Sequence, residues 1–138
     1  MLKIISVNTN GIRAAARKGF FDWLKRQNAD VVCIQETKAQ IHQLEDECFR
    51  PKGYFCYFND ALKKGYSGVA IFCRIKPKKI IYGIGYKEFD EEGRYLEVRF
   101  DSINVVSIYL PSGSSGDVRQ SFKMECLEKF ENHLKKLR

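Results

Sequence analysis

Two short apolar runs rich in β-branched residues, together with the polar residues that end them, constrain the fold of this chain most. Residues 3–7 lead into Asn8-Thr9-Asn10-Gly11, and residues 30–34 lead into Gln35-Glu36-Thr37-Lys38. Such runs are typical of buried strands, and ligands gather where strands of packed sheets end. The pattern therefore indicates a site at one edge of a sheet, although each residue alone is explained more simply as a turn former or a solvated strand end.

A third run, residues 103–110, ends in Pro111 and the sequence Ser-Gly-Ser-Ser-Gly. Proline cannot continue a central strand, and the following residues are typical of a turn. The chain thus offers a third strand end at which functional groups could meet the first two.

Five short segments in order along the chain resemble the exonuclease III family of apurinic/apyrimidinic endonucleases, which belongs to the larger endonuclease/exonuclease/phosphatase superfamily. Each segment is weak alone, but five in register make the resemblance specific. The segments are residues 4–13 (Ile-Ile-Ser-Val-Asn-Thr-Asn-Gly-Ile-Arg), 35–40 (Gln-Glu-Thr-Lys-Ala-Gln), 65–70 (Gly-Tyr-Ser-Gly-Val-Ala), 92–94 (Glu-Gly-Arg) and 109–113 (Tyr-Leu-Pro-Ser-Gly).

Composition limits the class of protein. The 138 residues are 44% hydrophobic and 30% charged, which is ordinary for one globular domain, and the formal charge of +7 favours a polyanionic partner. No apolar run approaches the ~20 residues that span a bilayer, and no signal peptide is visible, so we expect no membrane partner and a cytoplasmic location. Five cysteines without a C-x-x-C pair argue against a disulfide framework, a structural zinc site and thiol catalysis.

Hydrophobic periodicity predicts strands and helices along the whole chain. Strands are expected at residues 2–7, 30–35, 54–59, 68–74, 78–82, 95–100 and 103–110, and helices at 18–27, 41–49 and from 119 to the end. This order is an α/β pattern, a mixed β-sheet with helices on one face. It fits half of a four-layer α/β sandwich, with an apolar sheet face left uncovered.

The resemblance also implies a missing part. Family members continue with a Gly-Asp-(aromatic)-Asn strand end and a later Ser-Asp-His segment, and neither occurs in these 138 residues. We therefore expect residues 1–138 to be the N-terminal part of a single endonuclease/exonuclease/phosphatase domain. On that expectation the chain alone is inactive or very feeble, and a second chain carrying the C-terminal half is one conceivable partner.

The resemblance implies roles for four residues at the strand ends. Glu36 matches the family's metal-binding glutamate, and a single carboxylate suits Mg²⁺, with Mn²⁺ as an alternative. Asn10 is expected as a weaker ligand near the metal, and Asn8 as the residue that orients groups beside the metal and the phosphate. Tyr109 matches the tyrosine whose hydroxyl approaches the scissile phosphate.

The same resemblance implies contacts to double-stranded DNA carrying abasic sites or 3′ ends. Arg13, Lys18 and Lys38 are expected near the phosphate backbone, where contacts add affinity without reading sequence. Tyr66 would approach the duplex, and Arg94 would be presented to its minor groove.

Three hypotheses remain open at this stage. The first is a magnesium-dependent abasic-site endonuclease with 3′-to-5′ exonuclease activity, acting by in-line hydrolysis of a phosphodiester. The second is a non-catalytic half of a split or truncated enzyme that binds DNA or a partner. The third, another phosphoesterase of the superfamily acting on a different substrate, is disfavoured by the Gly-Tyr-Ser-Gly, Glu-Gly-Arg and Leu-Pro-Ser-Gly segments.

Overall fold

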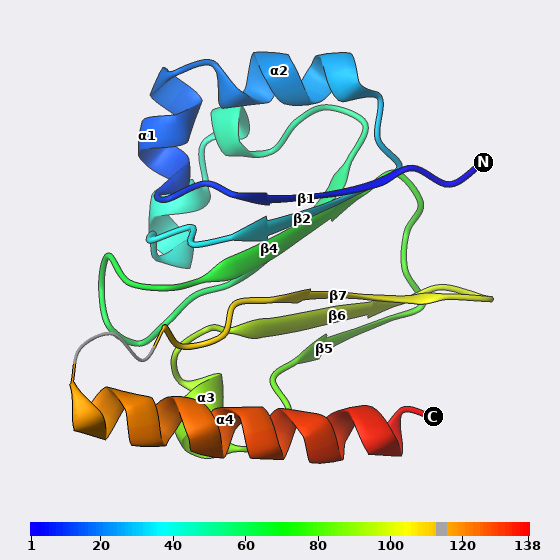
Figure 1. The fold of residues 1–138 in the computed structure, drawn as a ribbon. Coiled ribbons are helices and arrows are strands. Elements are labelled where there is room, and N and C mark those ends of the chain that lie inside the picture. Colours follow the sequence, from blue (N-terminus) through cyan, green and yellow to red (C-terminus); the bar gives the residue numbers. More distant parts are fainter. Residues whose placement is uncertain (113–115) are drawn as a thin grey trace.

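Two sheets pack face to face in the computed structural model, which describes residues 1–112 and 116–138 (Figure 1). The first sheet has the order β1-β2-β4-β3: β1 (Ile4–Asn8) runs parallel to β2 (Val31–Gln35), while β4 (Val69–Cys73) is antiparallel to both β2 and β3 (Phe55–Asn59). The second sheet is antiparallel, with β6 (Tyr95–Arg99) between β5 (Lys79–Tyr82) and β7 (Asn104–Ile108).

Helices cover the outer faces of both sheets. α1 (Ile12–Arg17) and α2 (Phe20–Gln27) lie over the first sheet, and α3 (Lys87–Asp90) and the long α4 (Asp117–Lys136) lie over the second (Figure 1). Two short 3₁₀ turns, η1 (Ile41–Leu44) and η2 (Glu47–Phe49), connect β2 to β3. The layers therefore run helix, sheet, sheet, helix.

Alternation along the strands builds three apolar clusters. Side chains of β2 and β4 that face inward meet those of β6 and β7 between the sheets, and this cluster comprises Val31, Cys33, Val69, Ile71, Cys73, Leu96, Val98 and Val105. The opposite faces of β2 and β4 pack against Ile12 and Leu24 of the first two helices. The outer face of the second sheet packs through Tyr95 against Cys126 and Phe130 of α4. The central strands β2 and β4 are buried on both faces, which explains their continuous apolar sequence.

The α/β class and the sandwich architecture are confirmed, and three details of the expectation are wrong. The strands expected from residue 78 onward form a second sheet, so the face of the first sheet is covered from within the chain. The expected helix at 41–49 is two 3₁₀ turns, and α1 and α3, both short, were not expected. Gly113, which ends the Tyr-Leu-Pro-Ser-Gly segment at residues 109–113, lies outside the described residues.

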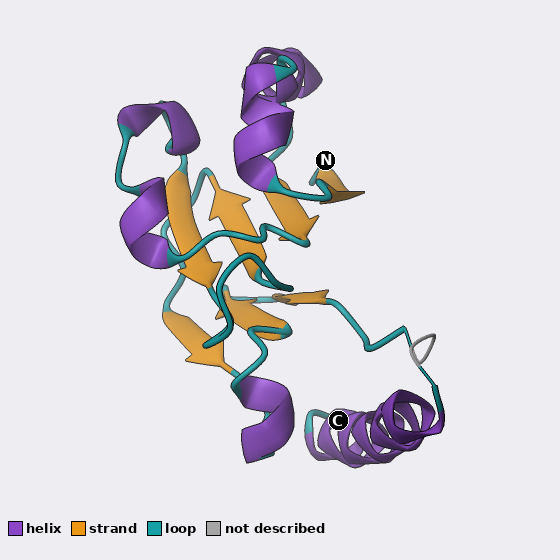
Figure 2. Ribbon diagram, turned by 90° about the vertical axis from the view of Figure 1, so that its left-hand side faces the viewer, coloured by secondary structure: helices purple, strands orange, loops and turns teal. Residues whose placement is uncertain are grey.

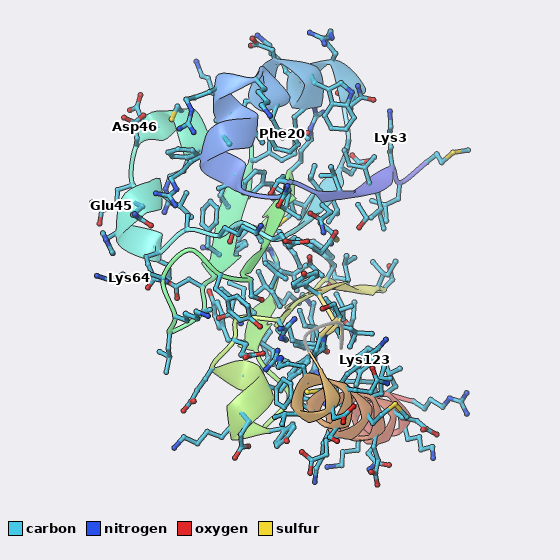
Figure 3. The ribbon with its side chains drawn as sticks, turned by 60° about the vertical axis from the view of Figure 1, so that its left-hand side comes forward. Lys3, Phe20, Glu45, Asp46, Lys64 and Lys123 are labelled. Carbon is cyan, nitrogen blue, oxygen red and sulfur yellow. The ribbon has the colours of Figure 1, made fainter. Side chains whose placement is uncertain are left out.

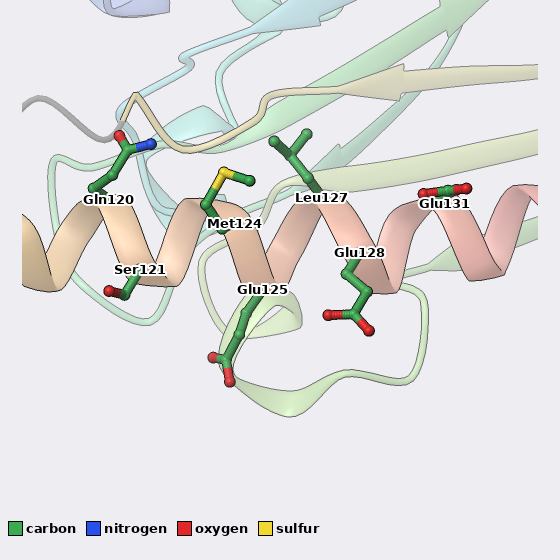
Figure 4. Close-up of a pocket in the computed structure, with 7 residues that line it drawn as sticks. All are labelled: Gln120, Ser121, Met124, Glu125, Leu127, Glu128 and Glu131. Atoms are coloured by element: carbon green, nitrogen blue, oxygen red, sulfur yellow. The ribbon is translucent and has the colours of Figure 1, made fainter.

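One side of the sandwich is open, next to β1. β7 lies opposite β2 and β4 rather than opposite β1, so β1 extends beyond the second sheet (Figure 2). The inward residues of β1 are consequently exposed, and Ile4 keeps 42% of its surface. Met124 of α4, which is 56% exposed, extends from its helix toward the strands in Figure 4. An edge with exposed apolar residues of this kind can pair with a further strand.

Candidate active site

The ends of β1, β2 and β7 and the loop before β4 meet at one edge of the sandwich. Parallel pairing aligns Asn8 with Gln35, so the residues that follow each strand lie side by side. The Gly11 amide donates to the Glu36 carbonyl at 2.7 Å, and the Thr37 amide donates to the Gly68 carbonyl at 3.1 Å. These backbone bonds bind three segments distant in sequence into one rim.

The rim has an unusual backbone. Asn10, Glu36, Lys38 and Ser67 have φ between 46° and 53°, the left-handed region, and together they are four of the five non-glycine residues with positive φ among those described. Each such residue costs of order 1–3 kcal/mol and persists only where its surroundings hold it. Clustering of this strain is typical of functional sites, and it places the Glu36 and Lys38 side chains on the same rim.

Glu36 is the centre of the polar contacts. Its carboxylate accepts a hydrogen bond from Asn8 Nδ2 at 2.8 Å and pairs with Lys38 Nζ at 3.4 Å, and its side chain is 18% exposed. Partial burial acts to raise the pKa of Glu36, but the interactions with Asn8, Tyr109 and Lys38 outweigh burial and lower it. Glu36 is therefore ionised at neutral pH, as a metal ligand must be.

Asn8, Asn10 and Lys38 support this carboxylate. The Asn8 side chain donates to Glu36 with its nitrogen, and its oxygen accepts the Asn10 amide at 3.0 Å. Lys38 Nζ donates to Asn10 Oδ1 at 2.6 Å while it also pairs with Glu36. The four predicted residues at the ends of the first two strands thus form one connected network.

Tyr109 reaches the network from the second sheet. It follows β7, and its hydroxyl lies near enough to the Glu36 carboxylate for each group to shift the pKa of the other. Burial, and then the negative charge of Glu36, raise the pKa of Tyr109 above its ordinary value. The phenol therefore stays protonated at neutral pH and remains a hydrogen-bond donor.

A hydroxyl inside the core connects the two sheets just below this rim. Ser107 Oγ on β7 donates to the Ile34 carbonyl of β2 at 3.0 Å and accepts from Gln35 Nε2 at 3.1 Å. Ser107 is only 1% exposed, so both bonds lie in apolar surroundings where they are costly to break.

The basic residues expected at DNA occupy different environments. Lys18, at the end of α1, is exposed. The half-buried Arg13 donates through Nη2 to the Lys38 carbonyl at 3.0 Å, and this bond links α1 to the rim. Figure 3 shows the exposed Lys64 extending outward from the loop that carries Tyr66.

Arg94 does not lie where the sequence placed it. It was expected at the DNA surface, but it is only 2% exposed and its guanidinium contacts protein groups: Glu92, the Tyr109 carbonyl and the Tyr66 hydroxyl. Tyr66 itself is half-buried, and Lys63 Nζ lies 4.9 Å from the centre of its ring. In this structure Arg94 has almost no surface to offer to a duplex.

Sequence reasoning missed two members of the site. Arg119, in the first turns of α4, donates to the Tyr66 hydroxyl at 2.9 Å and lies 3.5 Å from Glu92. Arg119 belongs to no apolar periodicity, and its only signal was a basic residue shortly after the Leu-Pro-Ser-Gly segment. Glu92 was part of the Glu-Gly-Arg segment, but no role was assigned to it.

The donor set fits a hard divalent cation. Glu36 and Asn10 present a carboxylate and an amide oxygen at a solvent-facing rim, and Mg²⁺ usually takes only one or two protein carboxylates and keeps several waters. No group of three or more His, Cys, Asp or Glu side chains suited to a metal occurs among residues 1–112 and 116–138.

Two hollows in the surface differ in their relation to the site. One of about 320 Å³ adjoins the rim between α1 and α2 and is lined by Thr9, Asn10, Ala14, Ala15, Lys18, Gly19, Phe20 and Trp23. The other, of about 530 Å³, lies on α4, where Glu125 and Glu128 point away from the strands (Figure 4). Of these two, only the first adjoins the predicted residues.

In the described part of the chain, no helix is both long and apolar enough to cross a bilayer.

Known proteins are similar to this chain in sequence and in fold. Residues 5–136 match the endonuclease/exonuclease/phosphatase family. An exodeoxyribonuclease of Bacillus subtilis is 40% identical over 137 residues, which are 99% of this chain and 53% of the relative. A DNA-(apurinic or apyrimidinic site) endonuclease of Dictyostelium discoideum is 34% identical over 138 residues, 99% of this chain and 38% of that protein.

Solved structures agree with the sequence matches. An AP endonuclease from Archaeoglobus fulgidus superimposes with a TM-score of 0.85 at 30% identity, over 99% of this chain and 52% of that one. This chain spans about half the length or less of these two curated relatives. The resemblance drawn from five sequence segments is confirmed, and the chain belongs to the endonuclease/exonuclease/phosphatase family.

Proposed function

We propose that this chain forms the N-terminal part of a DNA-repair phosphodiesterase, an abasic-site endonuclease with 3′-to-5′ exonuclease activity. The observation that carries the proposal is the meeting of Glu36, Asn8 and Lys38 from the first sheet with Tyr109 from the second. The exodeoxyribonuclease and the abasic-site endonuclease among its relatives support DNA as the substrate.

Glu36 and Asn10 are the residues that would hold Mg²⁺, with Mn²⁺ as an alternative. The ion supplies positive charge to a phosphate oxygen and to the leaving group. Lys38 pairs with Glu36 and bonds Asn10 in the arrangement seen here, and its ammonium would be released toward a phosphate once those two oxygens hold an ion. Tyr109, protonated at neutral pH, donates a hydrogen bond toward a phosphate oxygen, and Asn8 fixes the orientation of Glu36.

The duplex would lie along the rim and over the α1–α2 side. Lys18 lines the 320 Å³ hollow next to Asn10, and Arg13 lies earlier on the same helix. The net charge of +7 favours such a partner, since contacts to phosphates dominate DNA affinity. Abasic-site chemistry requires the sugar to leave the stack, and an exposed rim is accessible to a displaced nucleotide.

The proposal includes a second half. The Bacillus subtilis relative is about twice as long. β1 is an edge strand of the first sheet and its inward residues are exposed, so further strands can add beside it. We propose that the chain alone is inactive, because acid–base groups worth about a hundredfold to ten-thousandfold in rate are supplied by that half.

The decisive experiment is cleavage of a duplex with one abasic-site analogue in Mg²⁺. The chain is assayed alone, and then with the C-terminal half of the Bacillus subtilis relative supplied in trans. We expect cleavage only in the mixture and loss of cleavage in Glu36→Ala. A matched control is Glu131→Ala, which removes a 67% exposed carboxylate on α4 and should leave cleavage unchanged.

Three other outcomes discriminate. Cleavage by the chain alone would refute the need for a second half. Duplex binding without cleavage in the mixture would favour the non-catalytic alternative, a DNA- or partner-binding half. Cleavage that survives Glu36→Ala would remove the metal role assigned to Glu36.

A further inference from the structure

Arg94 makes three hydrogen bonds through its guanidinium. Its Nε donates to Glu92 Oε1 at 2.8 Å, Nη1 to the Tyr109 carbonyl at 2.9 Å, and Nη2 to the Tyr66 hydroxyl at 2.9 Å. Three different nitrogens of one planar group thus contact three different segments. With 2% exposure, the guanidinium is part of the interior.

Two of these contacts fix the residues on either side of the rim. The Tyr109 amide also donates to the Arg94 carbonyl at 2.9 Å, so Tyr109 is bonded to Arg94 through both its amide and its carbonyl. The guanidinium carbon lies 5.1 Å from the centre of the Tyr109 ring and 5.7 Å from that of Tyr66, within the range of cation–π attraction. Arg94 therefore constrains the backbone and the ring of Tyr109 together.

The charge of Arg94 is balanced inside the protein. Glu92 pairs with Arg94 and lies 3.5 Å from Arg119, which also donates to Tyr66. A buried guanidinium whose partners are all protein groups does not leave them for solvent or a duplex without a large penalty. This arrangement suits a structural support of the site better than a direct contact to DNA.

We propose that Arg94 is a positioning residue, which holds Tyr109 against Glu36 and fixes Tyr66 at the neighbouring loop. The inference rests on the proposed function for its catalytic consequence, but the positioning itself is a property of this chain. Lysine cannot replace Arg94, because a single ammonium lacks the planar fork that reaches three acceptors at once.

The positioning is tested on the chain alone by NMR of ¹³C-labelled tyrosine rings. The seven tyrosines are assigned by Tyr→Phe substitutions. We expect Arg94→Met and Arg94→Lys to shift the Tyr66 and Tyr109 signals and to leave those of Tyr57 and Tyr82, which lie elsewhere in the sheets, unchanged. If Arg94→Met fails to fold, Arg94→Lys, which keeps the charge, carries the same test.

Arg99→Met is the matched control. Arg99 ends β6, the strand that follows Arg94 directly, and it also pairs through Nε with a glutamate two residues earlier, Glu97, at 2.6 Å. That glutamate accepts from Tyr95, so Arg99→Met should shift the Tyr95 signal and leave Tyr66 and Tyr109 unchanged.

Cleavage in the complemented mixture supplies the second readout. Both Arg94 variants should lower the single-turnover rate roughly tenfold or more, since misplacement by about 1 Å is costly in rate, with the salt dependence of duplex binding unchanged. Arg99→Met should change neither quantity. A mixture in which wild type does not cleave refutes the proposed function, while the tyrosine spectra still decide the positioning.

Two results would overturn the inference. The first is a weaker duplex Kd in Arg94→Met, with Tyr66 and Tyr109 signals at their wild-type positions, which would make Arg94 a direct DNA contact. The second is an equal shift of all seven tyrosines, which would make Arg94 a general stability residue.

Discussion

Gly68 lies where the loop before β4 presses against the residues after β2, and replacing it by alanine should be costly. Gly68 has φ +87°, and a Cβ there would overlap Thr37 Oγ1 and lie 3.5 Å from Thr37 Cβ. The left-handed backbone costs alanine roughly 1–2 kcal/mol, and forcing an atom into a packed site costs about 1–3 kcal/mol more. Thr37 is 2% exposed and has little room to move. We therefore expect Gly68→Ala to lower the free energy of unfolding by about 2–5 kcal/mol.

Urea unfolding followed by the fluorescence of the single tryptophan, Trp23, measures this loss. Gly65→Ala is the matched control, because Gly65 has φ +65° but a Cβ added there would meet nothing within 4 Å. It should lose only the backbone part, roughly 1–2 kcal/mol. Adding Thr37→Ala to Gly68→Ala should recover part of the difference between the two variants. Equal losses in Gly65→Ala and Gly68→Ala would refute the steric argument.

Three further predictions concern other parts of the molecule. Burial acts to raise the pKa of Glu97, but hydrogen bonds from its tyrosine and arginine partners outweigh burial and lower that pKa. The contribution of Glu97 to the free energy of unfolding is therefore complete above the unfolded-state pKa and is lost as the pH falls through the folded-state pKa. Glu97→Gln should accordingly make the free energy of unfolding, measured with urea, fall less steeply between pH 7 and pH 3. Cys48 is the exposed cysteine, whereas burial raises the pKa of Cys33 and Cys73 to about 11, so iodoacetamide at pH 8 should modify Cys48 first, as read by peptide mass spectrometry. Lys18→Ala should weaken duplex binding and reduce its salt slope by about one unit in fluorescence anisotropy, whereas Lys129→Ala on α4 should leave both unchanged.

The strands of the fold could be predicted from the sequence because each is a short apolar run with a clear end. The second sheet could not be foreseen as a separate layer, since periodicity identifies strands but not their partners. α3 has four residues, too few for a helical period to show. The turns at 41–49 are 3₁₀ rather than α, and a charged segment with few apolar residues gives no signal that separates the two.

The residues at the strand ends could be predicted in the same way. Glu36, Asn8 and Asn10 follow directly from strand ends, and the structure brings them together with Lys38. Their roles in metal binding and catalysis stay predictions. The burial of Arg94 could not be predicted, because it depends on contacts with Tyr66 and Tyr109, two segments that the sequence does not show as neighbours of Arg94.

The Ser107 hydroxyl has a consequence for how the two sheets can move. It bonds β7 to the end of β2 within the apolar interface, where breaking both bonds would leave a buried hydroxyl without a partner. Sliding one sheet past the other by a single residue is a translation of about 3.3 Å, longer than the hydrogen bond itself. Such a slide would carry Tyr109 out of reach of Glu36. Ser107 therefore sets the translational alignment of the sheets, and with it the spacing between the proposed catalytic groups that each sheet carries.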